Sequence, residues 1–559
     1  MDHLRLVLVF SLALVLLLIY QAWVQDYASK VPPATTAGPD ASQPHDGAEG
    51  PGLPQGVPQV TTPAPAAAAP TGPTASAAGS VEPIRVETDV LRIEISPRGG
   101  TLVGAWLLDY PVTPERPEDK VRLFKPETPN LFLAQSGLIA AQADMLPTHE
   151  ALFESAATRH VLGPGQEALE VALTWTHPSG IQVIKRYGFQ RASYVVTLTQ
   201  EVTNGSSDPV VARNYNQLQR TELIDPQASR FIYTYTGGVY YSPEDKYKKV
   251  SFDNMRKAKL DRPVRDGWLA MIQHYFLAAW IPPRGVEEIF YTNVLDDSRY
   301  IIGAYSPAVT IQPGATHRFE NQLFVGPKLQ DTLERIAPGL ELTVDYGWLT
   351  VIAKPIHWLL AKIYLIVGNW GWAIIVLTIL IKLAFYKLSE TSYKSMANMR
   401  ELTPRLQALK DRYGDDKERL NQAMMELYKT EKINPLGGCL PILVQIPVFI
   451  ALYWVLLESV ELRQAPWILW IDNLSAPDRY FILPLIMGVS MYVQQKLNPA
   501  PPDPMQAKIM MSLPFVFTVF FAFFPSGLVL YWTVNNLLSI AQQWHITRNI
   551  EKAAAKRRR

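Results

Sequence analysis

At the start of its C-terminal third, the chain reads Thr378-Ile379-Leu380-Ile381-Lys382-Leu383-Ala384-Phe385-Tyr386. This stretch closes an apolar run, residues 366–386, that is long enough to cross a hydrocarbon core of about 30 Å. Lys382 lies inside the run, and an ionisable residue within a membrane is costly enough to need a reason. One reason is snorkelling, because Lys387 follows five residues later, about 7.5 Å further along a helix. The other reason is a polar cavity inside the membrane.

Five other apolar runs have a similar character. They are residues 6–20, 437–457, 480–494, 509–524 and 527–542. Some are short for a span, but a tilted helix or a thin local bilayer accommodates them. Prolines at positions 447, 484 and 514 predict kinks. Together with 366–386, the runs predict six transmembrane helices, of which the last five form a core over residues 366–547.

The first run predicts an N-terminal anchor over residues 1–27. A cleaved secretory signal is the alternative interpretation. However, the run is long for a signal core, and Tyr20-Gln21-Ala22-Trp23 contains no small-x-small cleavage site. We therefore favour an uncleaved anchor with its N-terminus in the cytoplasm.

The distribution of basic residues predicts the orientation. Residues 387–435 contain 10 Lys and Arg, and residues 548–559 contain six, whereas residues 461–478 contain only Arg463. Basic loops remain on the cytoplasmic side of a membrane. Six spans then place both termini in the cytoplasm and residues 25–345 outside, which in a Gram-negative plan is the periplasm.

Two regions of different composition lie between the anchor and the core. Residues 28–81 predict a disordered linker, because 30 of the 50 residues from 31 to 80 are Pro, Ala or Gly. Residues 82–340 predict one large β-sandwich domain. Alternating stretches such as Leu91-Arg92-Ile93-Glu94-Ile95 recur there, and turn signals such as Asn204-Gly205 separate them.

Three smaller segments complete the predicted organisation. Residues 341–365 are apolar and aromatic with interspersed lysines, which predicts an amphipathic helix at the membrane surface. Residues 389–433 carry apolar side chains at helical spacing on both sides of Gly414, which predicts a cytoplasmic helical hairpin. Residues 548–559 form a basic cytoplasmic tail.

Composition excludes several classes of function. The 559-residue chain has a net charge of +1 and a single cysteine, Cys439, so it builds no internal disulfide and no cysteine-based metal cluster. Its charged fraction of 18% and mean hydropathy of +0.02 suit a chain that is partly embedded in a membrane. Neither a phosphate-binding glycine loop nor an HExxH motif is present. We therefore expect neither an enzyme nor a cofactor or metal.

Polar residues in the other runs favour the cavity over snorkelling. Gln445 lies in the third run, and Asn535 and Asn536 lie in the last, with Trp532 four residues before Asn536. Each of them alone is typical of hydrogen bonding between membrane helices. Together they predict one wet cavity, open to the cytoplasm, in which Lys382 is the positive charge.

The C-terminal third resembles the YidC family of membrane protein insertases. The stretches that carry the resemblance are Gly368-Asn369-Trp370-Gly371, Asn434-Pro435-Leu436-Gly437-Gly438-Cys439-Leu440-Pro441, Val460-Glu461-Leu462-Arg463-Gln464-Ala465-Pro466, Asp503-Pro504-Met505-Gln506, and Phe524-Pro525-Ser526-Gly527-Leu528-Val529-Leu530-Tyr531-Trp532. The order of anchor, linker and β-rich domain is similar to that of the Gram-negative members.

The resemblance implies a multi-domain protein of the bacterial inner membrane. A periplasmic β-supersandwich would accompany a polytopic α-helical domain whose five-helix core holds a hydrophilic groove. Lys382 occupies the position where the family usually has arginine, so the charge is kept but the bidentate fork is lost. Thr378 and Trp532 match groove positions that substrates pass, and Gln445 and Asn536 match polar positions of the groove.

The function implied is an insertase and chaperone for nascent membrane proteins. Its implied partners are the ribosome, the Sec translocon and the lipid bilayer, without a small-molecule substrate, and the basic tail would contact ribosomal RNA nonspecifically. The alternatives are a small-solute transporter or channel, which would show inverted repeats, and an envelope sugar-binding or sugar-modifying protein. The first predicts solute flux in liposomes, and the second predicts function in the isolated domain 82–335.

Overall fold

The structure is a computed structural model that describes residues 82–558 except 143, 223–233, 297, 415, 432–439 and 499–503. The predicted anchor (1–27) and linker (28–81) lie outside the described residues. The described chain divides into two compact units, a β unit that ends at Val344 and a helical unit that begins at Asp345. The predicted β domain, 82–340, therefore ends within four residues of the observed boundary.

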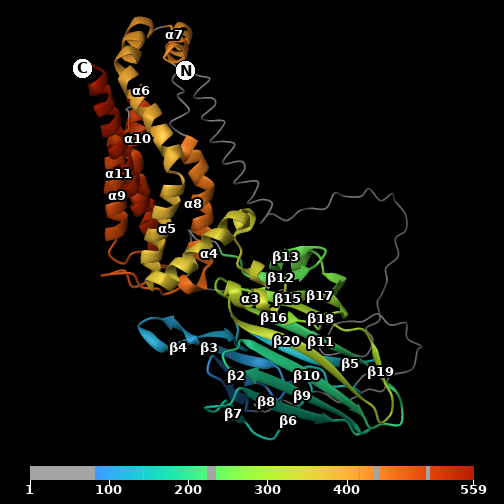
Figure 1. Cartoon of the computed structure of the whole chain (residues 1–559). Helices are drawn as coiled ribbons and strands as arrows, with labels where there is room; N and C mark the ends of the chain where they lie inside the picture. The colour runs from blue at the N-terminus through green and yellow to red at the C-terminus, as the bar shows by residue number, and fades with distance from the viewer. Residues whose placement is uncertain are drawn as a thin grey trace, which may run out of the picture. The chain divides into compact units, whose positions relative to one another are not determined.

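The β unit contains two large sheets, labelled in Figure 1. The first has 11 strands: β1 (Ile84–Glu87), β2 (Leu91–Ile95), β3 (Leu102–Thr113), β4 (Arg116–Phe124), β5 (Phe132–Ala140), β7 (Arg159–Val161), β11 (Val210–Thr221), β14 (Asp261–Arg265), β17 (Glu287–Leu295), β18 (Arg299–Tyr305) and β19 (Val309–Ile311). The second has nine: β6 (Glu154–Ser155), β8 (Ala168–Thr176), β9 (Ile181–Gln190), β10 (Val195–Asn204), β12 (Gly237–Ser242), β13 (Lys246–Val250), β15 (Trp268–Ile272), β16 (Phe276–Ile281) and β20 (Thr316–Pro327).

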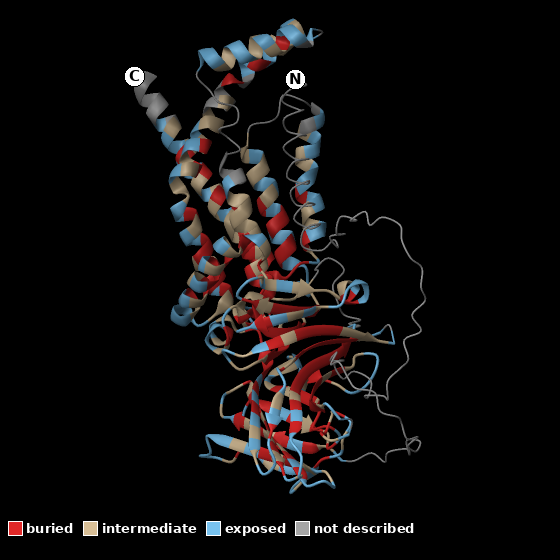
Figure 2. Cartoon of the chain, turned by 90° about the vertical axis from the view of Figure 1, so that its right-hand side faces the viewer, coloured by how far each residue is buried: buried red, intermediate tan, exposed pale blue. Residues whose placement is uncertain are grey.

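The strand order shows a sandwich in which distant segments pair. The first sheet runs β14-β17-β18-β11-β5-β3-β2-β1-β7, with β19 on β11 and β4 on β3, and the second runs β13-β12-β15-β16-β20-β10-β9-β8-β6. Neighbours are antiparallel except β1 and β7. Along β9 and β10, buried positions alternate with more exposed ones, as the period of two in the sequence predicts. Buried residues gather on strands of the β unit in Figure 2, and β15 is buried along its whole length. The two sheets confirm the predicted β-sandwich.

One buried lysine ties the two sheets together. Lys185 on β9 is 0% exposed, and its ammonium donates to Gly99 O at 2.6 Å, Ser136 O at 2.8 Å and Ser136 Oγ at 3.0 Å. It also lies 5.0 Å from the centre of the Phe153 ring. Burial lowers the pKa of Lys185 from 10.5 to about 7 because water no longer solvates its charge.

We expect the stability of the β unit to rise between pH 7 and pH 10 because of Lys185. In the unfolded chain this lysine keeps its proton up to about pH 10.5, whereas the buried amine releases it near pH 7. The unfolded state then binds more protons across that interval, so raising the pH favours the folded state by at most about 1.4 kcal/mol per pH unit. Urea unfolding of residues 82–344 measures the slope. Lys185→Met should flatten it, and the exposed control Lys248→Met should leave it unchanged; equal slopes in all three proteins would contradict the prediction.

The helical unit contains eight helices among the described residues. They are α4 (Thr350–Val367), α5 (Trp370–Ala384), α6 (Tyr386–Tyr413), α7 (Lys417–Thr430), α8 (Leu440–Glu458), α9 (Ile482–Leu497), α10 (Pro504–Phe521) and α11 (Ser526–Arg558). Short elements outside them are α2 (Phe252–Lys257), α3 (Gln330–Ile336) and the 3₁₀ turns η1 (Leu340–Thr343), η2 (Gly347–Leu349) and η4 (Val460–Leu462). Helices α6 and α7 lie where the sequence predicts a helical hairpin, and α6 extends beyond the bundle (Figure 1).

The run 366–386 is not one helix. Gly368 adopts a left-handed conformation (φ +66°) and ends α4, so residues 366 and 367 belong to that helix. Asn369 then caps α5 by accepting a hydrogen bond from the Trp372 amide at 3.2 Å. Proline 484 lies in the first turn of α9, where it removes no intrahelical hydrogen bond, so the kink predicted there has no cause.

Few of the described helices are both long enough and apolar enough to cross a membrane. Gly347–Val367 is long and apolar enough by itself, and Trp370–Ala384 with Tyr386–Ala397 forms a second candidate, bent by 66°, if the pair is one span. Val444–Glu458 and Ala507–Phe521 are apolar but shorter. The six-span count and the surface position of the helix at 341–365 therefore stay predictions.

Candidate functional site

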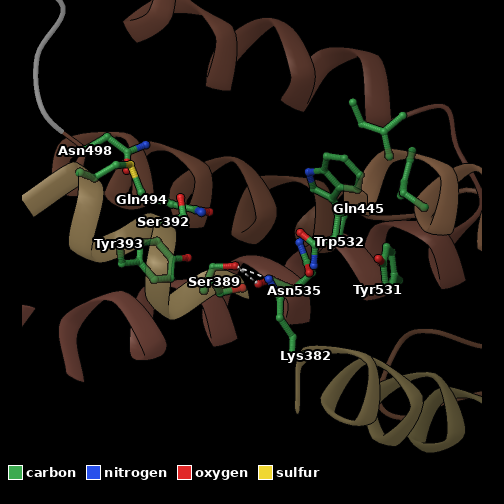
Figure 3. Close-up of a pocket in the computed structure, with 14 residues that line it drawn as sticks. Lys382, Ser389, Ser392, Tyr393, Gln445, Gln494, Asn498, Tyr531, Trp532 and Asn535 are labelled. Atoms are coloured by element: carbon green, nitrogen blue, oxygen red, sulfur yellow. Dashed lines mark hydrogen bonds between the residues drawn. The ribbon is translucent and has the colours of Figure 1, made fainter. Parts of the chain in front are cut away.

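Five segments of the helical unit enclose a cavity of about 230 Å³. It is lined by Lys382 of α5; Ser389, Ser392, Tyr393 and Met396 of α6; Gln445, Ile446 and Phe449 of α8; Gln494 and Asn498 at the end of α9; and Tyr531, Trp532, Asn535 and Ser539 of α11. Figure 3 draws these side chains, ten of them labelled, converging from different helices. Most of the lining side chains carry a polar atom, which is unusual between membrane helices.

Lys382 contributes a positive charge to this cavity. Its side chain is 8% exposed, and its ammonium donates to Ser539 Oγ on α11 at 2.7 Å (Figure 3). The Ser539 hydroxyl in turn donates to Asn535 O, one turn earlier, at 2.7 Å. Among the described residues, no carboxylate forms an ion pair with Lys382. The lysine therefore points across the bundle to α11 and does not snorkel along its own helix.

Two hydrogen-bond donors of the cavity lack an acceptor. Gln445 Nε2 and Trp532 Nε1 are both buried, and neither donates to any group of the described residues. The Trp532 ring is held edge-on against Phe449, with ring centres 4.2 Å apart. A buried polar group without a partner costs about 1–3 kcal/mol, so such groups call for an explanation. A polar chain segment that entered the cavity would supply the missing acceptors.

Four of the six predicted site residues line the cavity, and two do not. Lys382, Gln445, Trp532 and Asn535 line it. Thr378 is 1% exposed and donates to Ile374 O on its own helix at 2.6 Å. Asn536 is also buried and donates to Ser490 Oγ on α9 at 3.2 Å, so it joins two helices instead of facing the cavity.

Several lining residues were not predicted from the sequence. Ser389, Ser392 and Tyr393 come from the first turns of α6, a segment predicted to be part of the cytoplasmic hairpin. Their spacing of i, i+3 and i+4 places three hydroxyls on one helix face, and that pattern was a readable signal. Gln494 and Asn498 gave no such signal, because Gln494 ends an apolar run and Asn498 follows it, so both look like ordinary boundary residues.

The fold and this site together define a class of membrane protein in which a β-sandwich unit accompanies a helical unit with a cationic cavity. Comparison with known proteins identifies it further. Residues 83–359 match the family model of the YidC periplasmic domain, and residues 362–553 match that of the 60Kd inner membrane protein. The first match extends past the β unit into α4, which the sequence analysis had separated from it.

Curated relatives agree over the whole chain. A membrane protein insertase YidC of Thioalkalivibrio sulfidiphilus is 54% identical, and one of Methylococcus capsulatus is 52% identical, each covering 100% of both chains. A solved structure described as an active YidC insertase with its first transmembrane domain resolved is 18% identical and covers 83% of this chain and 92% of its own, with a TM-score of 0.38.

The chain belongs to the YidC family of membrane protein insertases. Its function is therefore the insertion of membrane proteins, and its β unit is the periplasmic domain of the family. The family is one of insertases and not of enzymes. Within the described parts of the chain, no group of three or more His, Cys, Asp or Glu residues is placed to hold a metal ion.

Proposed function

We propose that the cavity around Lys382 receives the polar end of a nascent membrane protein while its apolar segment passes into lipid. The observation that carries this proposal is the setting of Lys382. Its charge is buried, and its ammonium donates to a neutral hydroxyl. The cavity it faces also contains the donors of Gln445 and Trp532, which have no acceptor among the described residues. Acidic or carbonyl-rich segments would satisfy all three groups.

The cavity lowers the cost of moving polar groups through a membrane. A polar group that leaves water without a new hydrogen bond costs several kcal/mol in hydrocarbon, and a charge costs more. Lys382 attracts a carboxylate, and the hydroxyls of Ser389, Ser392 and Tyr393 replace part of its water shell. The membrane potential adds about 2.3 kcal/mol per charge per 100 mV for an acidic segment moving outward. No nucleotide or metal is needed.

The proposal includes a topology and a set of partners. Six spans with cytoplasmic termini are supported by the basic residues of 387–435 and 548–559. They place the hairpin of α6 and α7 in the cytoplasm, where it receives the substrate from the ribosome. The Sec translocon is a partner for part of the substrates, and the basic tail contacts ribosomal RNA nonspecifically.

Site-specific crosslinking tests the path of the substrate. A photo-crosslinking residue at Gln494, which lines the cavity, should capture a stalled nascent chain. The matched control on the same helix is Val489, which is 65% exposed on the outer side and should capture lipid but not the polar end of the chain. Capture at Val489 and none at Gln494 would contradict the proposal.

A further inference from the structure

The connection between α8 and α9 carries a small apolar projection. In the loop of residues 467–470 (Trp-Ile-Leu-Trp), Leu469 is 84% exposed and Ile468 is 38% exposed. No charged residue occurs between Arg463 and Asp472. We propose that the loop 467–470 is an anchor in the outer lipid interface that fixes the depth of α5, and with it the depth of Lys382. This inference rests on the membrane placement in the proposed function.

The backbone of the loop holds the apolar side chains outward. The Trp467 amide donates to Ile471 O at 2.9 Å, and the Ile471 amide donates to Ile468 O at 3.1 Å, which closes a tight turn. Leu469 at the tip has a φ of +54°. A left-handed conformation costs a non-glycine residue about 1–2 kcal/mol. A strained, exposed leucine is a poor choice at an aqueous surface, but it gains free energy if its side chain enters lipid.

The loop is fixed to the first turn of α5. Asn369 Nδ2 donates to Pro466 O at 3.2 Å and to Trp467 O at 3.3 Å, while its Oδ1 caps the helix. The Trp467 ring packs edge-on against Trp372, with ring centres 5.9 Å apart. It fits because Gly371 has no side chain; a Cβ there would lie 2.1 Å from Trp467 Cδ1. The loop and α5 therefore move as one piece.

The apolar surface of the loop continues along α5, which favours lipid as its partner. Trp372 is 45% exposed, and two and three turns later on the same face Ile379 and Leu383 are 37% and 62% exposed. Tryptophan is enriched where a membrane meets water, and three tryptophans lie at this end of the helix: Trp370 and Trp372 in the first turn of α5, and Trp467, which packs against Trp372. Along α5 the exposed stripe therefore changes from tryptophan to aliphatic residues. This is the order expected for a helix that passes from the lipid interface into the hydrocarbon core.

The anchor determines where the charge of the cavity lies. From Trp372 to Lys382 is ten residues, which is about 15 Å of helix. A hydrocarbon core is about 30 Å thick, so an anchor at one interface places Lys382 near its middle. There a buried charge attracts a carboxylate most strongly, because water screens it least.

Nitroxide labels on the full-length protein in liposomes test the anchor. Cys439→Ser removes the only cysteine, and single cysteines are then introduced as Leu469→Cys, Val489→Cys for a lipid-facing position on α9, and Leu152→Cys for an exposed position on the β unit. Each label is exposed to oxygen, which concentrates in lipid, and to a water-soluble nickel chelate. We expect the ratio of oxygen to nickel collisions at 469 to exceed that at 152 at least threefold.

A second variant tests the attachment to α5. Asn369→Ser keeps an oxygen to cap the helix but cannot reach the loop carbonyls. We expect it to lower the collision ratio at 469 at least twofold while the ratio at 489 stays the same; no change at 469 would overturn the attachment. A ratio at 469 equal to that at 152, or a label that neither reagent reaches, would overturn the anchor. A water-like ratio at 489 would instead show that the proposed membrane placement is wrong.

Discussion

Replacement of Lys382 by glutamate should reduce the insertion of a substrate with an acidic N-terminal tail at least tenfold. At about 6 Å and an effective dielectric of 20, two unit charges interact by about 3 kcal/mol. The substitution turns that attraction into repulsion. A tenfold reduction in insertion corresponds to only about 1.4 kcal/mol, which is less than the interaction that is lost. Because Lys382 is buried and has no ion pair with a described carboxylate, little within the protein compensates the change. Protease protection of the tail in inverted vesicles measures insertion.

A graded set of variants separates charge from structure. Lys382→Arg keeps the charge and should retain most of the insertion, and Lys382→Ala should be intermediate between wild type and Lys382→Glu. A second substrate with a neutral tail serves as the control, since it gains nothing from the charge and should be inserted nearly equally by all variants. If Lys382→Ala and Lys382→Glu insert the acidic-tailed substrate as well as wild type, the role proposed for Lys382 is wrong.

Replacement of Gly99 by alanine should cost the β unit at least about 4 kcal/mol of unfolding free energy, a loss that few single substitutions reach. Gly99 has a φ of +70°, and a Cβ there would lie 2.1 Å from the backbone oxygen of His149. A backbone atom cannot turn aside as a flexible side chain can. The shift would also disturb Gly99 O, which accepts a hydrogen bond from Lys185.

Gly165 provides the matched control for this substitution. Its φ of +82° is similarly left-handed, but no atom lies within 4 Å of the position of a Cβ. Gly165→Ala should therefore cost only the conformational part, about 1–2 kcal/mol. Urea unfolding of residues 82–344, with trypsin resistance of the full chain as a second readout, compares the two. Equal losses would show that the contact with His149 relaxes freely.

The sequence predicts the elements of this protein better than their ends. Periods of two and long apolar runs reflect which side of each element is buried, so the β-sandwich and the helical unit were both predictable. The run 366–386 was divided by Gly368 and Asn369, a stop and a start signal for helices that the hydrophobic pattern concealed. Composition measures apolar length, but local backbone geometry determines where a helix begins.

The site was predictable in part, for a physical reason. Lys382 was identified because a charge in an apolar run has few explanations, and Gln445, Trp532 and Asn535 because polar groups in spans are rare. Thr378 and Asn536 are also polar residues within predicted spans. However, Thr378 hydrogen-bonds to Ile374 of its own helix and Asn536 to Ser490 of α9, so neither side chain lines the cavity. Which face of a helix meets which neighbour is a property of packing and not of composition.

A histidine–glutamate pair outside the cavity was equally unpredictable from the sequence. His357 of α4 and Glu461 of η4 are 104 positions apart in the chain. The fold brings His357 Nε2 within 3.8 Å of Glu461 Oε1, where α4 packs against the end of α8. Contacts of this kind depend on crossing helices, which a linear pattern does not encode.

The sequence by itself determined the two kinds of structure and the presence of one charge inside an apolar run. These properties follow from the transfer of individual residues between water and a less polar medium, which each residue carries with it. Only the tertiary structure decided that Lys382 reaches Ser539, that hydroxyls of α6 face the same space, and that Gln445 and Trp532 remain unpaired there. Those facts depend on distances between helices that are far apart in the chain, and packing alone sets such distances.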